Sequence, residues 1–267
     1  METKQNDHLR AALVRYLETD LLFGVRAAPL KTPTMGKTAR QKSGGLKRHT
    51  PPETAPQPHR QTVSPEELAR RTEALRVLNE QHVTSCQKCQ LSQTRTKTVF
   101  GQGDPAARLV FVGEAPGRDE DLQGIAFIGR AGQLLTKMIE AMGLSRDEVF
   151  ICNILKCRPP NNRDPAQDEV SACWPYLDQQ LKIIHPEVIV TLGKPATQTL
   201  LRSTASIGSL RGRWHDYHMF GEEQGGQPIP LMPTYHPAYL LRSPGEKAKA
   251  WSDLKQVMAR LGLAISK

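Results

Sequence analysis

The sequence has few aromatic side chains, only five cysteines and no long hydrophobic run. Aromatic residues make up 5% of its 267 residues, which indicates that part of the chain is not packed into a core. No stretch approaches the roughly 18–20 consecutive apolar residues of a membrane-spanning helix. The first ten residues lack the charged-then-apolar order of a secretory signal. We therefore expect a cytoplasmic protein, a monomer, with no membrane partner.

Acidic residues are nearly absent from residues 26–61, which contain eight Lys and Arg against the single acid Glu53. This stretch carries +7 of the net charge of +9, so the rest of the chain carries only about +2. Its six prolines and lack of apolar periodicity predict a disordered basic linker over residues 26–62. Loose attraction to phosphate and a solvated spacer are both open as its role. Before it, helical spacing of apolar residues predicts an amphipathic helix within residues 1–25.

A folded domain is expected over residues 63–267. Its first helix is predicted to begin at Ser64 as N-cap, with Pro65 in the first turn and Glu67 completing a capping box. One face of this helix is expected to carry three leucines, namely Leu68, Leu75 and Leu78.

Short apolar runs alternate with helical patterns from about residue 107 onward. This alternation predicts an α/β fold, in which a mostly parallel sheet is covered on both faces by helices. Ligands of such folds bind at the carboxyl ends of the strands. Three polar residues are expected there, namely Glu114, Asn153 and His236. The sequence therefore predicts a functional site at this edge of the sheet.

Four of the five cysteines form two pairs. Cys86 and Cys89 make a C-x-x-C motif, and Cys157 and Cys173 flank a polar loop, whereas Cys152 lies inside an apolar strand. Two thiol pairs in an intracellular chain favour a four-cysteine metal site over disulfides. Zinc and an iron–sulfur cluster both accept four thiolates, and spacing does not separate them. Four unconnected thiols are the alternative.

Several stretches together resemble the family-4, iron–sulfur type of uracil-DNA glycosylase. They are "GEAPGRDEDLQGIAFIGRAGQLL", "NILKCRPPNNRDP", "TLGKPAT" and "PTYHPAYLLR", together with the four-cysteine spacing. The resemblance covers residues 80–262 and implies a three-layer α/β/α sandwich around a four-stranded sheet. It also implies a [4Fe–4S] cluster on the four cysteines. The implied activity is hydrolysis of the N-glycosidic bond of uracil in single- and double-stranded DNA, which releases uracil and leaves an abasic site.

The resemblance implies a pocket for a base flipped out of the helix. Phe127 would stack on the base, although an ordinary core Phe is equally expected. Asn153 would read the uracil edge, because an amide accepts from the ring N–H and donates to the carbonyl, the reverse of what cytosine needs. Gly113 and Gly117, beside Ala115, would let the backbone approach base and sugar closely.

Two residues are candidates for catalysis. A hydrogen bond from His236 would stabilise the negative charge that builds on the departing uracil. Glu114 would orient water or stabilise the cationic sugar, as carboxylates do in glycoside hydrolysis, or it would hold the loop through backbone N–H groups. Ala115 occupies the position at which a better-known branch of the superfamily has a water-positioning Asp. The neighbouring acids at residues 119–121 are expected to be a solvated turn, with a contribution of one of them to the site as the alternative.

Further residues are candidates for DNA contact. Arg130 precedes a helix whose free N–H groups suit a phosphate, and Arg211 and Arg213 are further candidates for the DNA backbone, with plain surface charge as the alternative. Leu240 or Leu241 would act as a wedge in the duplex with Arg242 on a phosphate, unless these residues only begin a buried helix.

Other functions remain open from the sequence. They are a uracil-DNA binder without turnover, a glycosylase for other deaminated bases, and a metal-stapled nucleic-acid module. A branch of the resembled superfamily that traps DNA covalently carries an additional histidine in the loop after the Asn153 strand. The loop here, "KCRPPNNRDP", contains no histidine, which argues against covalent trapping. Ala126 stands where the family commonly has Pro, which is expected to loosen the wall beside Phe127.

Overall fold

The computed structural model describes residues 63–219 and 227–264. The helix predicted within residues 1–25 and the linker predicted at 26–62 lie outside these described residues.

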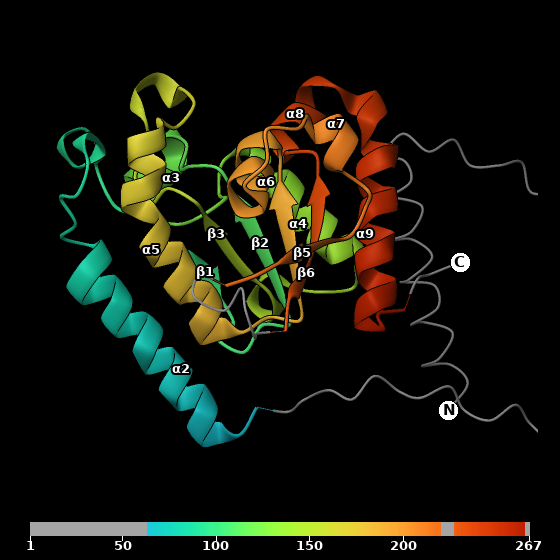
Figure 1. Ribbon diagram of the computed structural model, residues 1–267, viewed down its shortest axis with the longest axis horizontal. Coiled ribbons are helices and arrows are strands. Elements are labelled where there is room, and N and C mark those ends of the chain that lie inside the picture. The colour runs from blue at the N-terminus through green and yellow to red at the C-terminus, as the bar shows by residue number, and fades with distance from the viewer. Residues whose placement is uncertain (1–62, 220–226, 265–267) are drawn as a thin grey trace, which may run out of the picture.

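The described chain forms one mixed sheet with the order β1-β3-β2-β4-β6-β5 (Figure 1). The four central strands run parallel, whereas the edge strands β1 and β5 each pair antiparallel with their neighbour. The α/β class is therefore confirmed, but the expected four-stranded sheet is corrected to six strands. The edge strands were missed because they are only two and three residues long. The bounds are β1 Gln102–Gly103, β2 Leu109–Gly113, β3 Phe150–Asn153, β4 Val188–Leu192, β5 His215–Tyr217 and β6 Ile229–Thr234.

Helices cover both faces of the sheet, as the alternating pattern predicted (Figure 1). Successive strand residues pack on opposite sides: Val110 lies in the core cluster shared with α5, whereas Phe111 lies in the cluster shared with α4 and α9. The bounds are α2 Pro65–Val77, α3 Arg118–Gln123, α4 Arg130–Ala141, α5 Gln167–Ile184, α6 Lys194–Leu201, α7 Ile207–Leu210, α8 Pro237–Arg242 and α9 Lys247–Leu261. The shorter helical elements are the π-helix η1 Leu78–Val83 and the 3₁₀ helices η2 Gln90–Gln93, η3 Arg146–Glu148, η4 Pro160–Asn162 and η5 Pro244–Glu246.

Helix α2 begins where the sequence predicted. The Ser64 side chain accepts a hydrogen bond from the backbone N–H of Glu67, with Pro65 in the first turn. The reciprocal half of the capping box is wrong, because the Glu67 carboxylate pairs with Arg71 and Arg70 instead. Leu68 is also 38% exposed rather than on the buried face with the other two leucines.

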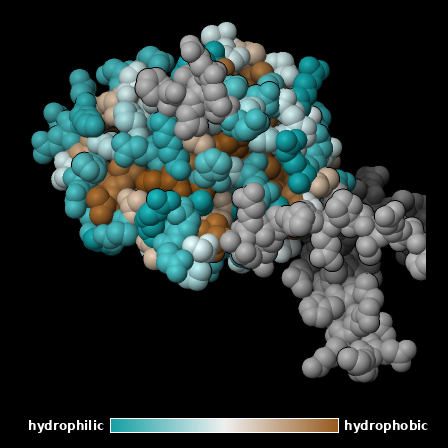
Figure 2. All heavy atoms as spheres, turned by 60° about the horizontal axis from the view of Figure 1, so that its bottom comes forward, coloured by the Kyte–Doolittle hydropathy of each residue, from teal (hydrophilic) through white to brown (hydrophobic). Residues whose placement is uncertain are grey.

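The α2 helix docks on α5, although the two are separated by about a hundred residues of chain (Figure 1). The Arg71 guanidinium donates to the carbonyl of Ile184 at the end of α5 over 2.6 Å. On the side that lies at the bottom of Figure 1, hydrophilic residues cover most of the surface and hydrophobic ones gather in a broken band (Figure 2). No helix within the described residues is both long and apolar enough to cross a bilayer.

Candidate active site

Strands β2 and β3 end side by side, and their last residues meet the aromatic ring of Phe127. Gly113 is paired in register with Asn153. A Cβ atom on Gly113 would lie 2.3 Å from the Asn153 Oδ1 atom and 2.5 Å from Cζ of Phe127. Both distances are shorter than any real side-chain contact, so only glycine fits between the amide and the ring. Three of the predicted site residues thus converge at the carboxyl edge of the sheet.

The Asn153 side chain is buried with one polar atom left unpaired. The residue is 1% exposed, and its Oδ1 atom has no hydrogen-bond partner among the described residues. An unpaired amide oxygen in a protein interior costs about 1–3 kcal/mol. An acceptor held in this state is suited to a ligand that supplies an N–H group, because binding then satisfies an oxygen that folding left unsatisfied.

The backbone at Phe127 is held in an unusual conformation. Its φ of 51° lies in the left-handed region, which bulky residues rarely adopt. Two features support it. Gly132 at the start of α4 lets the Phe127 carbonyl come so close that a Cβ there would lie 1.9 Å from the oxygen. From the other side, the Arg146 guanidinium donates to the carbonyls of Ala126 and Phe127 over 2.8 and 3.1 Å.

Two of the three acids at residues 119–121 are buried and do not lie in the solvated turn that the sequence predicted, whereas Asp119 is exposed. Glu120 is buried, and its carboxylate accepts hydrogen bonds from the backbone N–H groups of Gly117, Ile128 and Gly129 at 2.9–3.1 Å. Asp121 is also buried and accepts from the backbone of Thr96. Glu120 therefore joins the loop after β2 to the loop after Phe127. Sequence analysis missed this role, as it missed Arg146, because their partners lie in other loops.

His236 precedes helix α8 and faces Phe127. The two ring centroids are 5.8 Å apart with an interplanar angle of 32°. The His236 Nδ1 atom accepts a hydrogen bond from the backbone N–H of Ala238 over 3.0 Å. Burial, and then the positive charge of Arg242, lower the pKa of His236 to about 4. At neutral pH the ring is therefore uncharged with its proton on Nε2, which makes Nε2–H a hydrogen-bond donor.

Glu114 follows β2 directly and is half-buried. Burial, and then the negative charge of Asp164, raise the pKa of its carboxyl group to about 7. A carboxyl group with such a pKa exchanges a proton with water near neutral pH, which suits a general base. Within the described residues, the Glu114 carboxylate accepts no hydrogen bond from a backbone N–H group. The backbone N–H groups of Gly117, Ile128 and Gly129 donate to Glu120 instead.

The residues predicted to contact DNA have different surroundings. Arg130 and Arg242 are exposed, and Leu241 is 37% exposed. Leu240 is fully buried, so only Leu241 of the two leucines is available at the surface. Arg211 instead forms a two-pronged ion pair with the buried Asp253. The same carboxylate accepts from the Thr234 hydroxyl at the end of β6, so Arg211 supports the strand that leads to His236.

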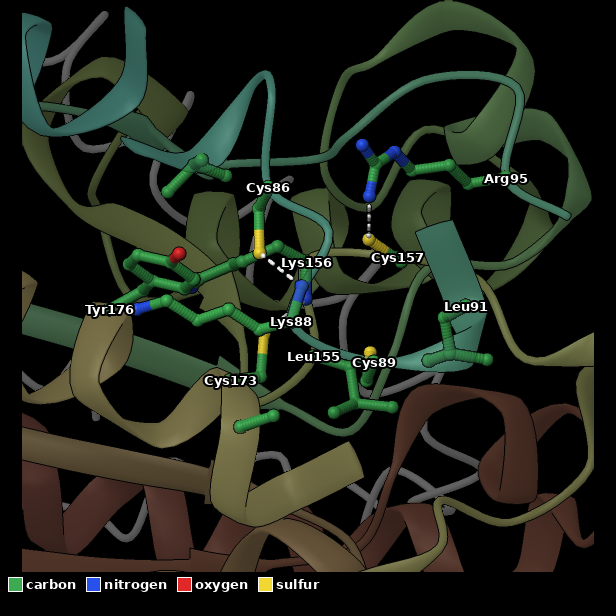
Figure 3. Close-up of a pocket in the computed structure, with 12 residues that line it drawn as sticks. Cys86, Lys88, Cys89, Leu91, Arg95, Leu155, Lys156, Cys157, Cys173 and Tyr176 are labelled. Carbon is green, nitrogen blue, oxygen red and sulfur yellow. Dashed lines mark hydrogen bonds between the residues drawn. The ribbon is translucent and has the colours of Figure 1, made fainter. Parts of the chain in front are cut away.

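The four predicted cysteines line one cavity between the segment after α2, the segment after β3 and helix α5 (Figure 3). Three of the sulfurs already accept hydrogen bonds: Cys86 from the backbone N–H of Lys88 over 3.5 Å, Cys157 from the Arg95 guanidinium over 3.3 Å, and Cys173 from the backbone N–H of Lys156 over 3.2 Å. Burial raises the pKa of the Cys157 thiol, and raises that of Cys173 to about 11, whereas these donors act in the opposite direction and favour the thiolates. Cys152 does not line this cavity and lies in the core, as predicted.

The donor set of this cavity fits a metal cofactor. All four side chains are thiols, which are the ligands of zinc and of iron–sulfur clusters. Within the described part of the chain, however, no three His, Cys, Asp or Glu side chains converge as the ligands of a metal ion would. The four cysteines instead surround a space.

The fold and the site together define a class of DNA-repair protein. The uracil DNA glycosylase superfamily model matches residues 100–255, so the chain belongs to this superfamily. Within it, the chain is similar to three relatives that are each named Type-4 uracil-DNA glycosylase. The relative from Sulfurisphaera tokodaii is 47% identical and that from Saccharolobus solfataricus 44%, covering 66% and 67% of this chain and 80% and 83% of the relatives. The relative from Archaeoglobus fulgidus is 44% identical over 66% of this chain and 87% of its own.

Proposed function

We propose that this chain is a uracil-DNA glycosylase that hydrolyses the N-glycosidic bond of uracil in single- and double-stranded DNA. The observation that carries the proposal is the buried, unpaired Oδ1 atom of Asn153 beside the Phe127 ring. Uracil has an N–H at ring position 3 for this acceptor and a carbonyl next to it for the amide NH₂ group. Cytosine offers a lone pair and an amino group at these places, so Asn153 discriminates against it.

His236 then supplies the donor that the reaction needs. As the bond between sugar and base breaks, negative charge develops on the uracil oxygens. Because the pKa of His236 is about 4, the ring is already neutral at neutral pH. Its Nε2–H group stabilises the developing charge by donating a hydrogen bond. The Nδ1 bond to Ala238 keeps the proton on the correct nitrogen. The ring of Phe127, next to His236, provides the stacking surface for the base.

Glu114 provides the second half of the chemistry. Its carboxylate orients and deprotonates the water that attacks the sugar carbon, and its charge stabilises the cationic sugar. With a pKa near 7, the group is partly ionised at neutral pH and loses little driving force when it accepts a proton. Ala115 and Gly117 leave space for the sugar and the water beside this carboxylate, whereas Gly113 leaves space for the Asn153 amide and the Phe127 ring.

We further propose that the four cysteines hold a [4Fe–4S] cluster. A zinc ion would draw all four sulfurs to about 2.3 Å from one point, whereas each iron of a cluster takes one thiolate. Side chains that surround a cavity without converging suit the second arrangement. When bound, the cluster would join the segment after α2 to the segment that follows β3, the strand that ends at Asn153. Exposed Arg130 and Arg242 contact DNA phosphates, and Leu241 fills the gap left by the flipped base.

The test is excision of uracil from a labelled oligonucleotide that contains one U, with T and C oligonucleotides as controls. We expect cleavage after alkali at U alone. Asn153→Asp should lower uracil excision by about 10²–10³-fold and reduce the preference for uracil over cytosine. Asn79→Asp, the same change on the distant π-helix η1, should behave as wild type. If the wild-type protein binds uracil-DNA but releases no uracil, the protein is a binder without turnover and the proposal is wrong.

A further inference from the structure

Lys156 is the least expected buried residue of the domain. Its side chain is 1% exposed, although it carries an amino group on a long flexible stem. Lysine is almost never fully buried unless it is paired with an opposite charge. Within the described residues, the acceptors of its Nζ group are two neutral oxygens. They are the backbone carbonyl of Asn153 at 2.8 Å and the Oε1 atom of Gln180 at 2.5 Å.

These contacts join the two sites of the molecule. The Lys156 backbone N–H donates to Cys173, and Lys156 lines the four-cysteine cavity (Figure 3). Its Nζ group donates to the carbonyl of Asn153. Gln180 lies on α5, two turns after Cys173, and donates in turn to the carbonyl of Phe100 over 2.9 Å. Asn153, the last residue of β3, is therefore held by the Lys156 side chain, which begins at the cysteine site.

We propose that Lys156 is a positioning residue that couples the four-cysteine site to base recognition by Asn153. The inference rests on the proposed function of Asn153. The Lys156 Nζ group donates to the Asn153 carbonyl and so fixes the peptide plane from which the amide side chain projects.

Lys156 matters because the peptide group between Asn153 and Ile154 is held by few other hydrogen bonds. The next N–H group, of Ile154, donates to the Gly113 carbonyl over 3.0 Å, which fixes one side of the peptide. The Asn153 carbonyl has left the ladder of the sheet, and Lys156 is its donor. Without this donor a buried carbonyl is unsatisfied, and rotation of the peptide to find a partner moves the side chain that reads the base.

The experiment compares Lys156→Met with Ile154→Val, a packing change in the same buried segment that removes no polar contact. Each change is made in the wild type and in Asn153→Ala. Three quantities are measured in the full chain: the single-turnover rate on uracil-DNA, the bound iron and acid-labile sulfide, and binding to DNA. The binding probe is an oligonucleotide with a non-hydrolysable 2′-fluoro-deoxyuridine, against the same oligonucleotide with thymidine.

Lys156→Met is expected to keep its iron and to lower the single-turnover rate by about 10- to 100-fold. Its preference for the fluoro-uridine DNA over the thymidine DNA should fall in parallel. In the Asn153→Ala background the same change should cost less than about threefold, because the amide it positions is gone. Ile154→Val should cost equally little in both backgrounds. Equal losses from Lys156→Met in both backgrounds would overturn the proposal.

A second variant decides the case if Lys156→Met loses its iron or fails to fold. Gln180→Leu removes the amide that holds the Lys156 Nζ group, and it touches neither Asn153 nor a cysteine. The same non-additive loss with Asn153→Ala supports the proposal, and additive losses contradict it. A wild-type protein that releases no uracil would contradict the proposed function instead. The binding preference would then still test the coupling between Lys156 and Asn153.

Discussion

The base-recognition edge and the four-cysteine cavity lie at the two ends of one short segment, residues 153–157, yet they are built in opposite ways. At the edge, a polar atom is buried without a partner and the backbone beside it is strained. In the cavity, thiol groups already receive N–H donors from the protein. A site that binds and releases a ligand keeps its polar atoms unsatisfied, whereas a site that holds a permanent group surrounds it with donors in advance.

The largest expected effect is loss of the cysteine site. Cys157→Ser should lose iron and unfold at a lower temperature, because the proposed cluster would no longer join the segment after α2 to the segment after β3. The packing of α2 on α5 and the hydrogen bond from the Tyr176 hydroxyl to the His82 carbonyl should still hold these helices together. Thermal unfolding and iron content measure this. Cys152→Ala, a buried cysteine outside the cavity, is the matched control and should keep its iron at a cost of about 1 kcal/mol in unfolding free energy. Equal behaviour of the two variants would remove the distinction between cavity and core.

At the base-recognition edge, His236→Ala should lower the single-turnover rate by about 10²–10³-fold with little change in DNA affinity. The loss should be constant from about pH 5.5 to 8, since His236 is neutral throughout this range. Folding lowers the pKa of His236 from 6.5 to about 4. The free energy of unfolding is therefore higher above pH 6.5, and this contribution is lost as the pH falls toward 4. A rate loss that disappears at high pH would show that a charged histidine is needed.

A smaller loss is expected from Gly113→Ala. The new methyl group would lie 2.3 Å from the Asn153 Oδ1 atom and would displace either the amide or the Phe127 ring. Overpacking of this kind costs about 1–3 kcal/mol of stability, and affinity for the non-hydrolysable uracil oligonucleotide should fall with it. Gly245→Ala is the control, because a Cβ there meets nothing within 4 Å. Unchanged uracil affinity in Gly113→Ala would separate Gly113 from the base site.

The smallest predicted effect is a shift in pH dependence. The single-turnover rate should rise with pH through about 7 as Glu114 ionises, and Glu114→Gln should abolish this rise. Asp164→Asn removes a negative charge that raises the Glu114 pKa, so the midpoint should move to lower pH. Because folding raises the pKa of Glu114 from 4.5 to about 7, this group adds to the free energy of unfolding at low pH. That contribution is lost as the pH rises through about 7. Glu114→Gln should therefore be more stable than wild type at about pH 8 and similar at about pH 4.

Much of the site could be predicted from the sequence because its signals are local. Apolar runs that end in Glu114 and Asn153 identify strand ends, and parallel strands bring such ends to one edge. The role of Lys156 had a signal of the same kind, a lone lysine inside the apolar run "ILKC". Its meaning was missed, because the sequence does not show which distant oxygen a lysine reaches.

The order of residues is enough to predict the alternation of strands and helices, the quartet of cysteines and the polar residues at the strand ends. The other features depend on contacts between distant parts of the chain. The two short edge strands exist because neighbouring strands supply their hydrogen bonds. Glu120 is a loop clamp, Arg211 is an ion-pair partner and His236 is a neutral donor, because in each case the deciding partner or the burial comes from another part of the chain. Periodicity reports local conformation, whereas the protonation state and the partner of a side chain depend on contacts made only after folding.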